Sequence, residues 1–231
     1  METSKTALIV IDMQNDFLSG SLALKDCPAK QDGEKCVEVI NNLVQLSSFD
    51  IVVYSLDWHP DDHISFVNNA PNFPHHESST ADLENLNVYD TVIFQMDDKP
   101  LEQVMWPAHC VQNSWGAELQ KDLMIVKDSY KVYKGTNKVV DSYSAFFDNA
   151  RLSKTNLENI LRDNGVAKVV LCGVATDVCV HYSAMDSASL GFDTSVIIDA
   201  CAGVVTENIS KALDKWKDLG IKCKNASDFL S

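Results

Sequence analysis

The sequence predicts an α/β fold built on a single doubly wound, mainly parallel β-sheet with helices on both faces. Short β-branched runs alternate along the chain with amphipathic segments, and the apolar runs are continuous instead of alternating with polar residues. Continuous apolar strands are typical of parallel sheets, because helices cover such sheets on both sides. The 231 residues contain no linker, repeat or low-complexity tract, so one domain over residues 1–231 is expected.

The predicted elements alternate in type along most of the chain. Strands are predicted at 7–11, 51–57, 91–94, 123–127, 168–171 and 194–199, with a short edge strand at 221–223. Helices are predicted at 36–46, 152–163, 177–190 and 207–219. The segment 60–90 is rich in Asn, His, Ser and Pro, which predicts a long functional loop.

Composition excludes several classes of partner. A net charge of −14 would repel a nucleic-acid backbone or an anionic membrane. No apolar run approaches the roughly 18 residues of a membrane span, and the N-terminal stretch lacks the basic region of a signal peptide. The seven cysteines show no C-x-x-C spacing, which disfavours a redox pair or a cysteine-based zinc site. A reduced, cytoplasmic protein is expected, with the nucleus and a homo-oligomer left open.

Polar or reactive residues follow three of the predicted strands. In an open parallel sheet, ligands bind beyond the carboxyl ends of the strands. Asp12 ends the first strand, and Asp57 with His59 ends the second. The strand at 168–171 runs into Gly173 and then Cys179. These side chains are therefore expected to converge on one site.

Cys179 is a candidate nucleophile, because the N-terminus of a helix favours thiolate over thiol. The free N–H groups of Ala175 and Cys179 could hold a developing oxyanion. Asp12 would then accept the thiol proton and later return it. The alternatives are that Cys179 is a small buried hydrophobic residue, as Cys172 is expected to be, and that Asp12 is a helix cap or turn residue.

Asp57 and His59 form a candidate metal site. Residues two apart on an extended segment point to the same side, and a carboxylate with an imidazole suits zinc, iron or manganese. His109 in "WPAHC" is the leading third ligand, and His63 is the alternative. A capped turn with a surface histidine would also explain the Asp57–His59 spacing.

Three further residues are expected to be exposed when considered singly. His75 and His76 lie on the predicted loop and are expected to be solvated. Lys134 stands among charged neighbours, which indicates a solvated lysine. A functional Lys134 would instead stabilise the thiolate and a tetrahedral oxyanion.

Five ordered segments together resemble the nicotinamidases of the isochorismatase-like cysteine hydrolase superfamily. They are "ALIVIDMQNDFLSGSLAL" at 7–24, "DWHPDDHISF" at 57–66, "WPAHCVQNSWGAEL" at 106–119, "YKGTN" with "DSYSAF" at 133–146, and "GVATDVCV" at 173–180. The resemblance implies the isochorismatase-like hydrolase fold and covers essentially the whole chain. The stretch "FQMDDKPLEQVM" at 94–105 and the acidic segment after Cys27 match no family motif, so the role of 95–105 stays open.

The resemblance also implies a set of site residues. It implies a catalytic triad of Asp12, Lys134 and Cys179, a cis peptide between Val174 and Ala175 that turns the Ala175 N–H towards the oxyanion, ring-walling aromatics Phe17 and Trp106, and metal ligands Asp57, His59 and His109. His63 matches a histidine that is a further ligand in only some relatives.

The implied reaction converts nicotinamide and water into nicotinic acid and ammonia through a thioester on Cys179, feeding NAD salvage. The implied cofactor is a divalent metal, zinc first, with iron or manganese as alternatives. Two other interpretations stay open. One is another cysteine amidohydrolase of the same superfamily, and the other is a non-catalytic metal- or ligand-binding scaffold.

Overall fold

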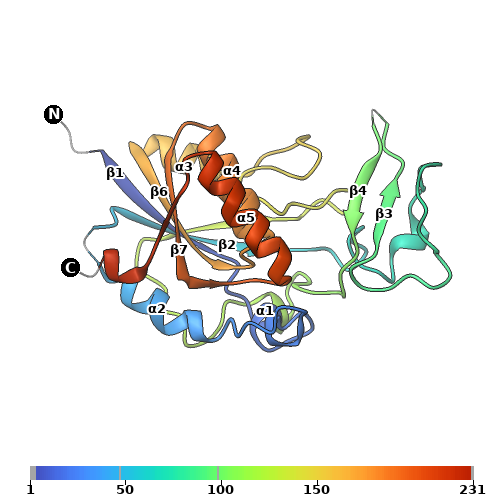
Figure 1. Cartoon of the computed structure of the whole chain (residues 1–231), viewed down its shortest axis with the longest axis horizontal. Helices are drawn as coiled ribbons and strands as arrows, with labels where there is room; N and C mark the ends of the chain where they lie inside the picture. The colour runs from blue at the N-terminus through green and yellow to red at the C-terminus, as the bar shows by residue number, and fades with distance from the viewer. Residues whose placement is uncertain (1–3, 47, 98, 230–231) are drawn as a thin grey trace.

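A six-stranded, wholly parallel sheet forms the centre of the computed structural model, which describes residues 4–46, 48–97 and 99–229. The strand order is β5-β2-β1-β6-β7-β8 (Figure 1). The strands span Lys5–Ile11 (β1), Ile51–Asp57 (β2), Tyr130–Lys134 (β5), Val166–Val174 (β6), Asp193–Ala202 (β7) and Lys222–Lys224 (β8). The order reverses direction between β1 and β6, as in a doubly wound sheet.

Helices cover both faces of this sheet, which confirms the predicted fold class (Figure 1). On one face lie the short α1 (Asn15–Leu18) and α2 (Lys35–Leu43), and on the other lie α3 (Leu157–Asp163), α4 (Cys179–Ser189) and α5 (Thr206–Asp218). Alternate residues of β1 face opposite layers, with Leu8 and Val10 towards α2 and Ile9 towards α3 to α5.

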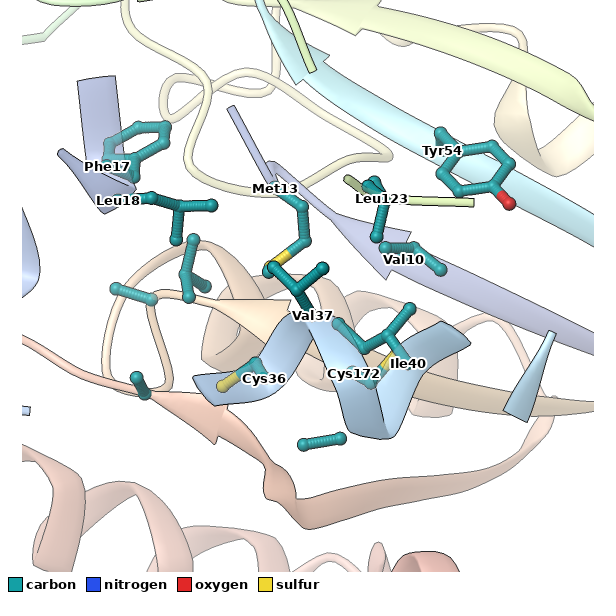
Figure 2. Packing of buried hydrophobic residues seen from close by; sticks show 14 of the residues in the cluster. Val10, Met13, Phe17, Leu18, Cys36, Val37, Ile40, Tyr54, Leu123 and Cys172 are labelled. Carbon is teal, nitrogen blue, oxygen red and sulfur yellow. The ribbon is translucent and has the colours of Figure 1, made fainter. Parts of the chain in front are cut away.

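The layer between α2 and the sheet shows how helical spacing produces the core. Val37 and Ile40 lie one turn apart on α2 and point towards Val10 and Cys172 on neighbouring strands (Figure 2). Burying each such aliphatic side chain contributes about 1.5–3 kcal/mol. Figure 2 also shows Met13 and Phe17 continuing this layer beyond the end of β1, towards the carboxyl edge of the sheet.

The strand predicted at 123–127 is wrong, and the chain instead forms β5 seven residues later. Leu123 is buried, but Met124 and Ile125 are exposed and belong to a turn region. Strand β5 lies at the sheet edge, so buried Val132 alternates with exposed Tyr133. An edge strand with one solvated face has fewer apolar residues than a central strand, which hid it in the sequence.

The strand predicted at 91–94 exists but lies outside the central sheet. β3 (Thr91–Phe94) pairs with β4 (Leu101–Val104) as an antiparallel hairpin that extends from the end of the molecule opposite both termini (Figure 1). Val92, Phe94 and Met105 of this region share a small core with Ile64 and Ala70. The loop at 60–90 therefore packs on the hairpin, and its only described helix is the 3₁₀ turn Ala70–Asn72.

The helix predicted at 36–46 ends at Leu43, and two other helices begin later than predicted. The helix predicted from residue 152 begins at Leu157, whose N–H donates to the Thr155 hydroxyl at 3.1 Å. The helix predicted from residue 177 begins at Cys179, because the Asp177 carboxylate instead accepts the N–H groups of Val204 and Val205. In the described part of the chain, none of the helices combines the length and apolar character needed to cross a bilayer.

Candidate active site and metal centre

Four strands of the sheet deliver their following residues to one buried cluster. Asp12 comes directly after β1, Asp57 is the last residue of β2, and Lys134 is the last residue of β5. Cys179 begins α4, five residues after β6 ends. All four side chains are at least 95 % buried, so the convergence expected at the carboxyl edge is present.

The ammonium group of Lys134 lies at the centre of this cluster. Its Nζ is 2.9 Å from Oδ2 of Asp12, 2.5 Å from Oδ1 of Asp57 and 3.4 Å from Sγ of Cys179. Nζ also donates to the carbonyl of Ser142 at 3.0 Å. The expectation of a solvated lysine is therefore wrong. Of the charged neighbours that suggested exposure, Lys127 and Asp128 lie in an exposed turn before β5 and Lys131 lies on the solvated face of that strand, whereas Lys134 points inward between two carboxylates.

Burial and charge set the protonation states of the cluster. Burial lowers the pKa of Lys134, but the Asp12 and Asp57 carboxylates outweigh it and hold that pKa well above its usual range. Burial raises the pKa of Asp12, and Lys134 opposes this shift only in part. Burial also raises the pKa of the Cys179 thiol well above its ordinary value. The expected lowering by the helix N-terminus is thus not found, because removing the sulfur from water disfavours its charged form more strongly.

Two polar side chains hold the carboxylates, and sequence reasoning did not identify either. Ser55 donates its hydroxyl to Oδ1 of Asp12 at 2.6 Å. The side chain of Gln14 accepts the Asp57 N–H at 2.8 Å and donates to the Asp57 carbonyl at 2.7 Å. For Ser55, the available signal was the presence of a serine inside the apolar run "IVVYSLD". These three hydrogen bonds tie the segment that follows β1 to β2 at the site.

Asp57, His59 and His109 could hold a metal ion. One ligand atom from each lies within 4.8 Å of the others. Oδ2 of Asp57 is 3.6 Å from Nε2 of His59 and 3.9 Å from Nε2 of His109. Two atoms bound to one tetrahedral ion at about 2.1 Å are separated by about 3.4 Å, so these spacings suit a common ion. Burial would raise the pKa of Asp57, but Lys134 and His59 hold it below its usual range, so its carboxylate is ionised.

Backbone carbonyls orient both histidines for such a role. Nδ1 of His59 lies 2.8 Å from the Gly135 carbonyl, and Nδ1 of His109 lies 2.8 Å from the Pro107 carbonyl. A carbonyl can only accept, so each Nδ1 carries the proton and each Nε2 presents a lone pair towards Asp57. Gly135 has φ +63°, and a Cβ there would stand 2.5 Å from Nδ1 of His59. Glycine is therefore required at this position.

His63 lies next to the candidate ligands Asp57, His59 and His109, but it is not grouped with Asp57 and His109. Its ring stacks on His59 with centroids 4.1 Å apart, and its Nδ1 is 2.7 Å from the Ser65 hydroxyl. Its ligand atom groups with His59 and Asp141, not with Asp57 and His109. Within the described residues its buried Nε2 has no hydrogen-bond partner. Burial lowers the pKa of His63 to about 3, so the ring is neutral at pH 7.

The two loop histidines stay away from the metal candidates but are not fully solvated. His75 and His76 are both half-buried, which corrects the expectation. The hairpin explains their burial, because His75 pairs with Phe94 of β3 and the His76 N–H donates to the Ile93 carbonyl at 2.9 Å.

A cavity of about 370 Å³, counting its solvent-open part, leads to the thiol and the metal candidates. Cys179, Asp57 and His109 border it at the polar end. Its remaining wall is mainly apolar and includes Phe17, Trp106, Tyr143, Val178 and Val204. Phe17 and Trp106 were expected here from the sequence, whereas Tyr143 and the neighbouring Asp141 were not identified. Both lie in the quoted segment "DSYSAF", which was the available signal.

Ala175 and Cys179, whose N–H groups were expected to hold an oxyanion, both line this cavity. The peptide between Val174 and Ala175 is cis, as the resemblance implies. The N–H groups of Thr176 and Val180 donate to backbone carbonyls. Within the described part of the chain, no such acceptor is found for the N–H groups of Ala175 and Cys179. These two donors are therefore free for a ligand in the cavity.

Comparison with known proteins identifies the family of this chain. The family model described as "Isochorismatase domain" matches residues 6–226. The chain belongs to the isochorismatase family. An Escherichia coli (strain K12) nicotinamidase is 38% identical over 200 residues, which cover 86% of this chain and 83% of the relative.

Solved structures give the same result. The structure of an Acinetobacter baumanii nicotinamidase is similar with a TM-score of 0.82 and 33% identity, covering 99% of both chains. The structure of a Pyrococcus horikoshii pyrazinamidase in complex with zinc is similar with a TM-score of 0.71 and 30% identity, covering 96% of this chain and 99% of that one. The chain therefore resembles isochorismatase-family amidases over nearly its whole length.

Proposed function

We propose that the protein is a nicotinamide amidohydrolase that converts nicotinamide and water into nicotinic acid and ammonia and so feeds NAD salvage. The observation that carries the proposal is the position of Lys134, whose Nζ lies within 3.4 Å of groups on Asp12, Asp57 and Cys179. This arrangement supports the proposal, because a carboxylate, a thiol and a candidate metal ligand surround one ammonium group at the polar end of a cavity with aromatic walls.

In the first half of the reaction, Asp12 accepts the thiol proton as the sulfur attacks the carboxamide carbon. The raised pKa of Cys179 means that the thiolate forms only when the base takes its proton, and the raised pKa of Asp12 makes that carboxylate a stronger base. The developing oxyanion accepts hydrogen bonds from the Ala175 and Cys179 N–H groups, and Lys134 offsets the negative charge.

The leaving group must depart as ammonia, because an amide ion is too strong a base to leave. Asp12 returns its proton to the nitrogen, the C–N bond breaks, and the acyl group remains on Cys179 as a thioester. A water molecule then attacks the thioester carbon with its oxygen, and Asp12 accepts a proton from that water. The C–S bond breaks, Asp12 returns this proton to the leaving sulfur, and nicotinic acid is released.

Asp57, His59 and His109 are the residues proposed to hold a divalent metal, with zinc first and iron or manganese as alternatives. A cation fits their neighbourhood, because the buried carboxylates of Asp12 and Asp57 together exceed the single charge of Lys134. The metal would supply Lewis acidity to the aromatic ring nitrogen of the substrate, which orients the ring and draws electrons from the carboxamide.

Amide specificity tests this proposal. Ammonia release from nicotinamide is compared with release from a panel of other carboxamides that includes pyrazinamide. The account expects kcat/KM for nicotinamide to be among the highest of the panel. A far higher kcat/KM for an unrelated amide would instead favour another amidohydrolase of the family.

A non-catalytic scaffold is the alternative from a different class. Cys179→Ala separates the two, because an acyl carrier is indispensable to the enzyme and irrelevant to a binding scaffold. Cys36→Ala is the matched control, since Cys36 is equally buried and burial raises its pKa to about 12. Ammonia release by the wild type that is lost only in the Cys179 variant supports the enzyme. No release by the wild type would favour the scaffold, and unchanged release in both variants would refute Cys179 as the nucleophile.

We further propose that residues 1–231 form a single isochorismatase-like hydrolase domain that acts in the cytoplasm. The match of the family model to residues 6–226 supports the single domain. The substrate is a small molecule, and the net charge of −14 makes nucleic acid and anionic membranes unfavourable partners.

A further inference from the structure

The β3–β4 hairpin carries one polar side chain that is completely buried. Gln103 lies on β4, and its side chain has no exposure to solvent. It stands three residues before Trp106, which lines the cavity. The segment around it matches no motif of the family resemblance, and nothing in the proposed reaction uses it. A buried amide costs stability unless hydrogen bonds compensate it, so its partners indicate what it does.

Those partners belong to the cavity wall. Nε2 of Gln103 donates to the hydroxyl of Tyr143 at 3.0 Å and to Oδ2 of Asp141 at 3.2 Å. It also donates to the carbonyl of Val104 at 2.8 Å. The two hydrogens of Nε2 are therefore shared among three acceptors. The orientation of the amide follows from this set, because a carbonyl oxygen in place of Nε2 would face the Val104 carbonyl with no hydrogen between them.

The amide is not fully satisfied in this position. Within the described residues, the buried Oε1 of Gln103 has no hydrogen-bond partner. A side chain selected only to fill space at this point would be better as an apolar residue. An amide at this position is explained if the hydrogen bonds that Nε2 donates to Asp141 and Tyr143 are needed, even though leaving Oε1 unpaired lowers stability.

The segment 141–143 links Gln103 to the reacting groups. Asp141 and Tyr143 both line the cavity, and Gln103 binds the side chains of both. Between them, the carbonyl of Ser142 accepts a hydrogen bond from Lys134 at 3.0 Å. The Gln103 amide thus binds the side chains on either side of Ser142, whose carbonyl accepts the hydrogen bond from Lys134.

We propose that Gln103 is a positioning residue that fixes Asp141 and Tyr143 in the wall of the substrate cavity, and so makes the β3–β4 hairpin part of the binding site. The inference rests on the proposed nicotinamide hydrolysis. Gln103 acts on ring binding more than on the chemical step, because Lys134 is held by Asp12 and Asp57 as well as by the Ser142 carbonyl and contacts neither Asp141 nor Tyr143 among the described hydrogen bonds.

Gln103→Met tests this role, because methionine has a similar length and no N–H donor. The KM for nicotinamide is expected to rise about fivefold or more while kcat stays within about twofold. A purely structural role would give a different pattern. Partial unfolding lowers the concentration of active molecules and therefore the apparent kcat, but it leaves KM unchanged.

Two further variants sharpen the test. Gln95→Met is the matched control, since Gln95 is an exposed glutamine on the same hairpin whose side chain, among the residues that the structure describes, donates to the Met96 carbonyl and to no cavity residue. Its KM should equal that of the wild type. In a Tyr143→Phe background, the effect of Gln103→Met on KM should shrink, because one of its partners has already lost its hydroxyl. An unchanged KM in Gln103→Met, or an equal rise in Gln95→Met, would overturn the proposal.

Binding of nicotinic acid by calorimetry separates failure of this inference from failure of the proposed function. If wild-type protein does not hydrolyse nicotinamide, the proposed function fails whatever Gln103 does. If wild-type protein hydrolyses it, and Gln103→Met binds nicotinic acid as tightly as the wild type, the function stands and the positioning role is wrong. Weaker binding by Gln103→Met but not by Gln95→Met supports the inference.

Discussion

Nζ of Lys134 lies 2.9 Å from Oδ2 of Asp12, and both side chains are completely shielded from solvent. An ammonium and a carboxylate so placed would lose stability if either stood alone, because each would be an unpaired charge in a medium of low dielectric constant. The pair keeps Asp12 next to Cys179 in a form that can accept a proton. This pairing explains why the site contains a fully buried lysine.

Asp12→Asn is expected to lower kcat about 10²- to 10⁴-fold. The amide has nearly the same shape but cannot accept the thiol proton. Steady-state ammonia release measures the loss, and circular dichroism checks that the fold is kept. Asp186→Asn is a suitable control, because Asp186 is a buried aspartate that pairs with Arg151 and does not line the cavity. A near-normal kcat in Asp12→Asn would show that another base operates.

Metal removal should abolish activity. A chelator takes away the Lewis acid proposed at Asp57, His59 and His109, and added zinc or manganese should restore turnover. His109→Ala should lose both bound metal and activity, whereas His76→Ala, outside the ligand cluster, should retain both. Full turnover by protein shown to be metal-free would contradict the assigned role.

Gly135→Ala is expected to reduce metal affinity about 10- to 100-fold, the usual effect of disturbing a group that orients a ligand. The added Cβ would stand 2.3 Å from Cε1 of His59, so the ring must turn away. Gly165→Ala isolates the backbone effect, because Gly165 has φ +72° but no atom within 4 Å of the added carbon. Metal content after dialysis distinguishes the two variants. Equal metal content in Gly135→Ala and Gly165→Ala would show that the contact between the added Cβ and His59 does not affect metal binding.

The acid limb of kcat/KM should lie above the ordinary pKa of an aspartate. Burial raises the pKa of Asp12 in the folded protein, and only the unprotonated carboxylate can accept the thiol proton. Activity is therefore lost as pH falls through this raised value. Bound metal is measured at each pH, so that metal release is not mistaken for protonation of Asp12. A kcat/KM that stays constant down to about pH 4 with metal retained would contradict this assignment.

Much of this site could be predicted because its residues follow strands. Asp57 and His59 are two apart on an extended segment, and their ligand atoms do lie close together. The carboxyl edge of a parallel sheet was the correct place to look for Asp12 and Cys179. These inferences depend on local geometry, which a sequence pattern can carry.

The remaining features depend on packing between distant segments. Burial of Lys134 follows from pairing of β5 with β2, which sets Lys134 opposite Asp57, and the sequence placed that strand at the wrong residues. The direction of the Cys179 pKa shift also depends on complete burial, which the position of a helix start does not indicate. The role of Gln103 has no local pattern, because the two side chains that it binds, Asp141 and Tyr143, lie about 40 residues further along the chain.

The central claim is that the reaction passes through an acyl group on one sulfur. Protein mixed with excess nicotinamide and quenched in acid during turnover can be analysed by mass spectrometry of the intact chain and of its peptides. The account expects a fraction of the protein to carry one nicotinoyl group, located on the peptide that contains Cys179. Sustained ammonia release with no acyl group on that peptide at any quench time would contradict it.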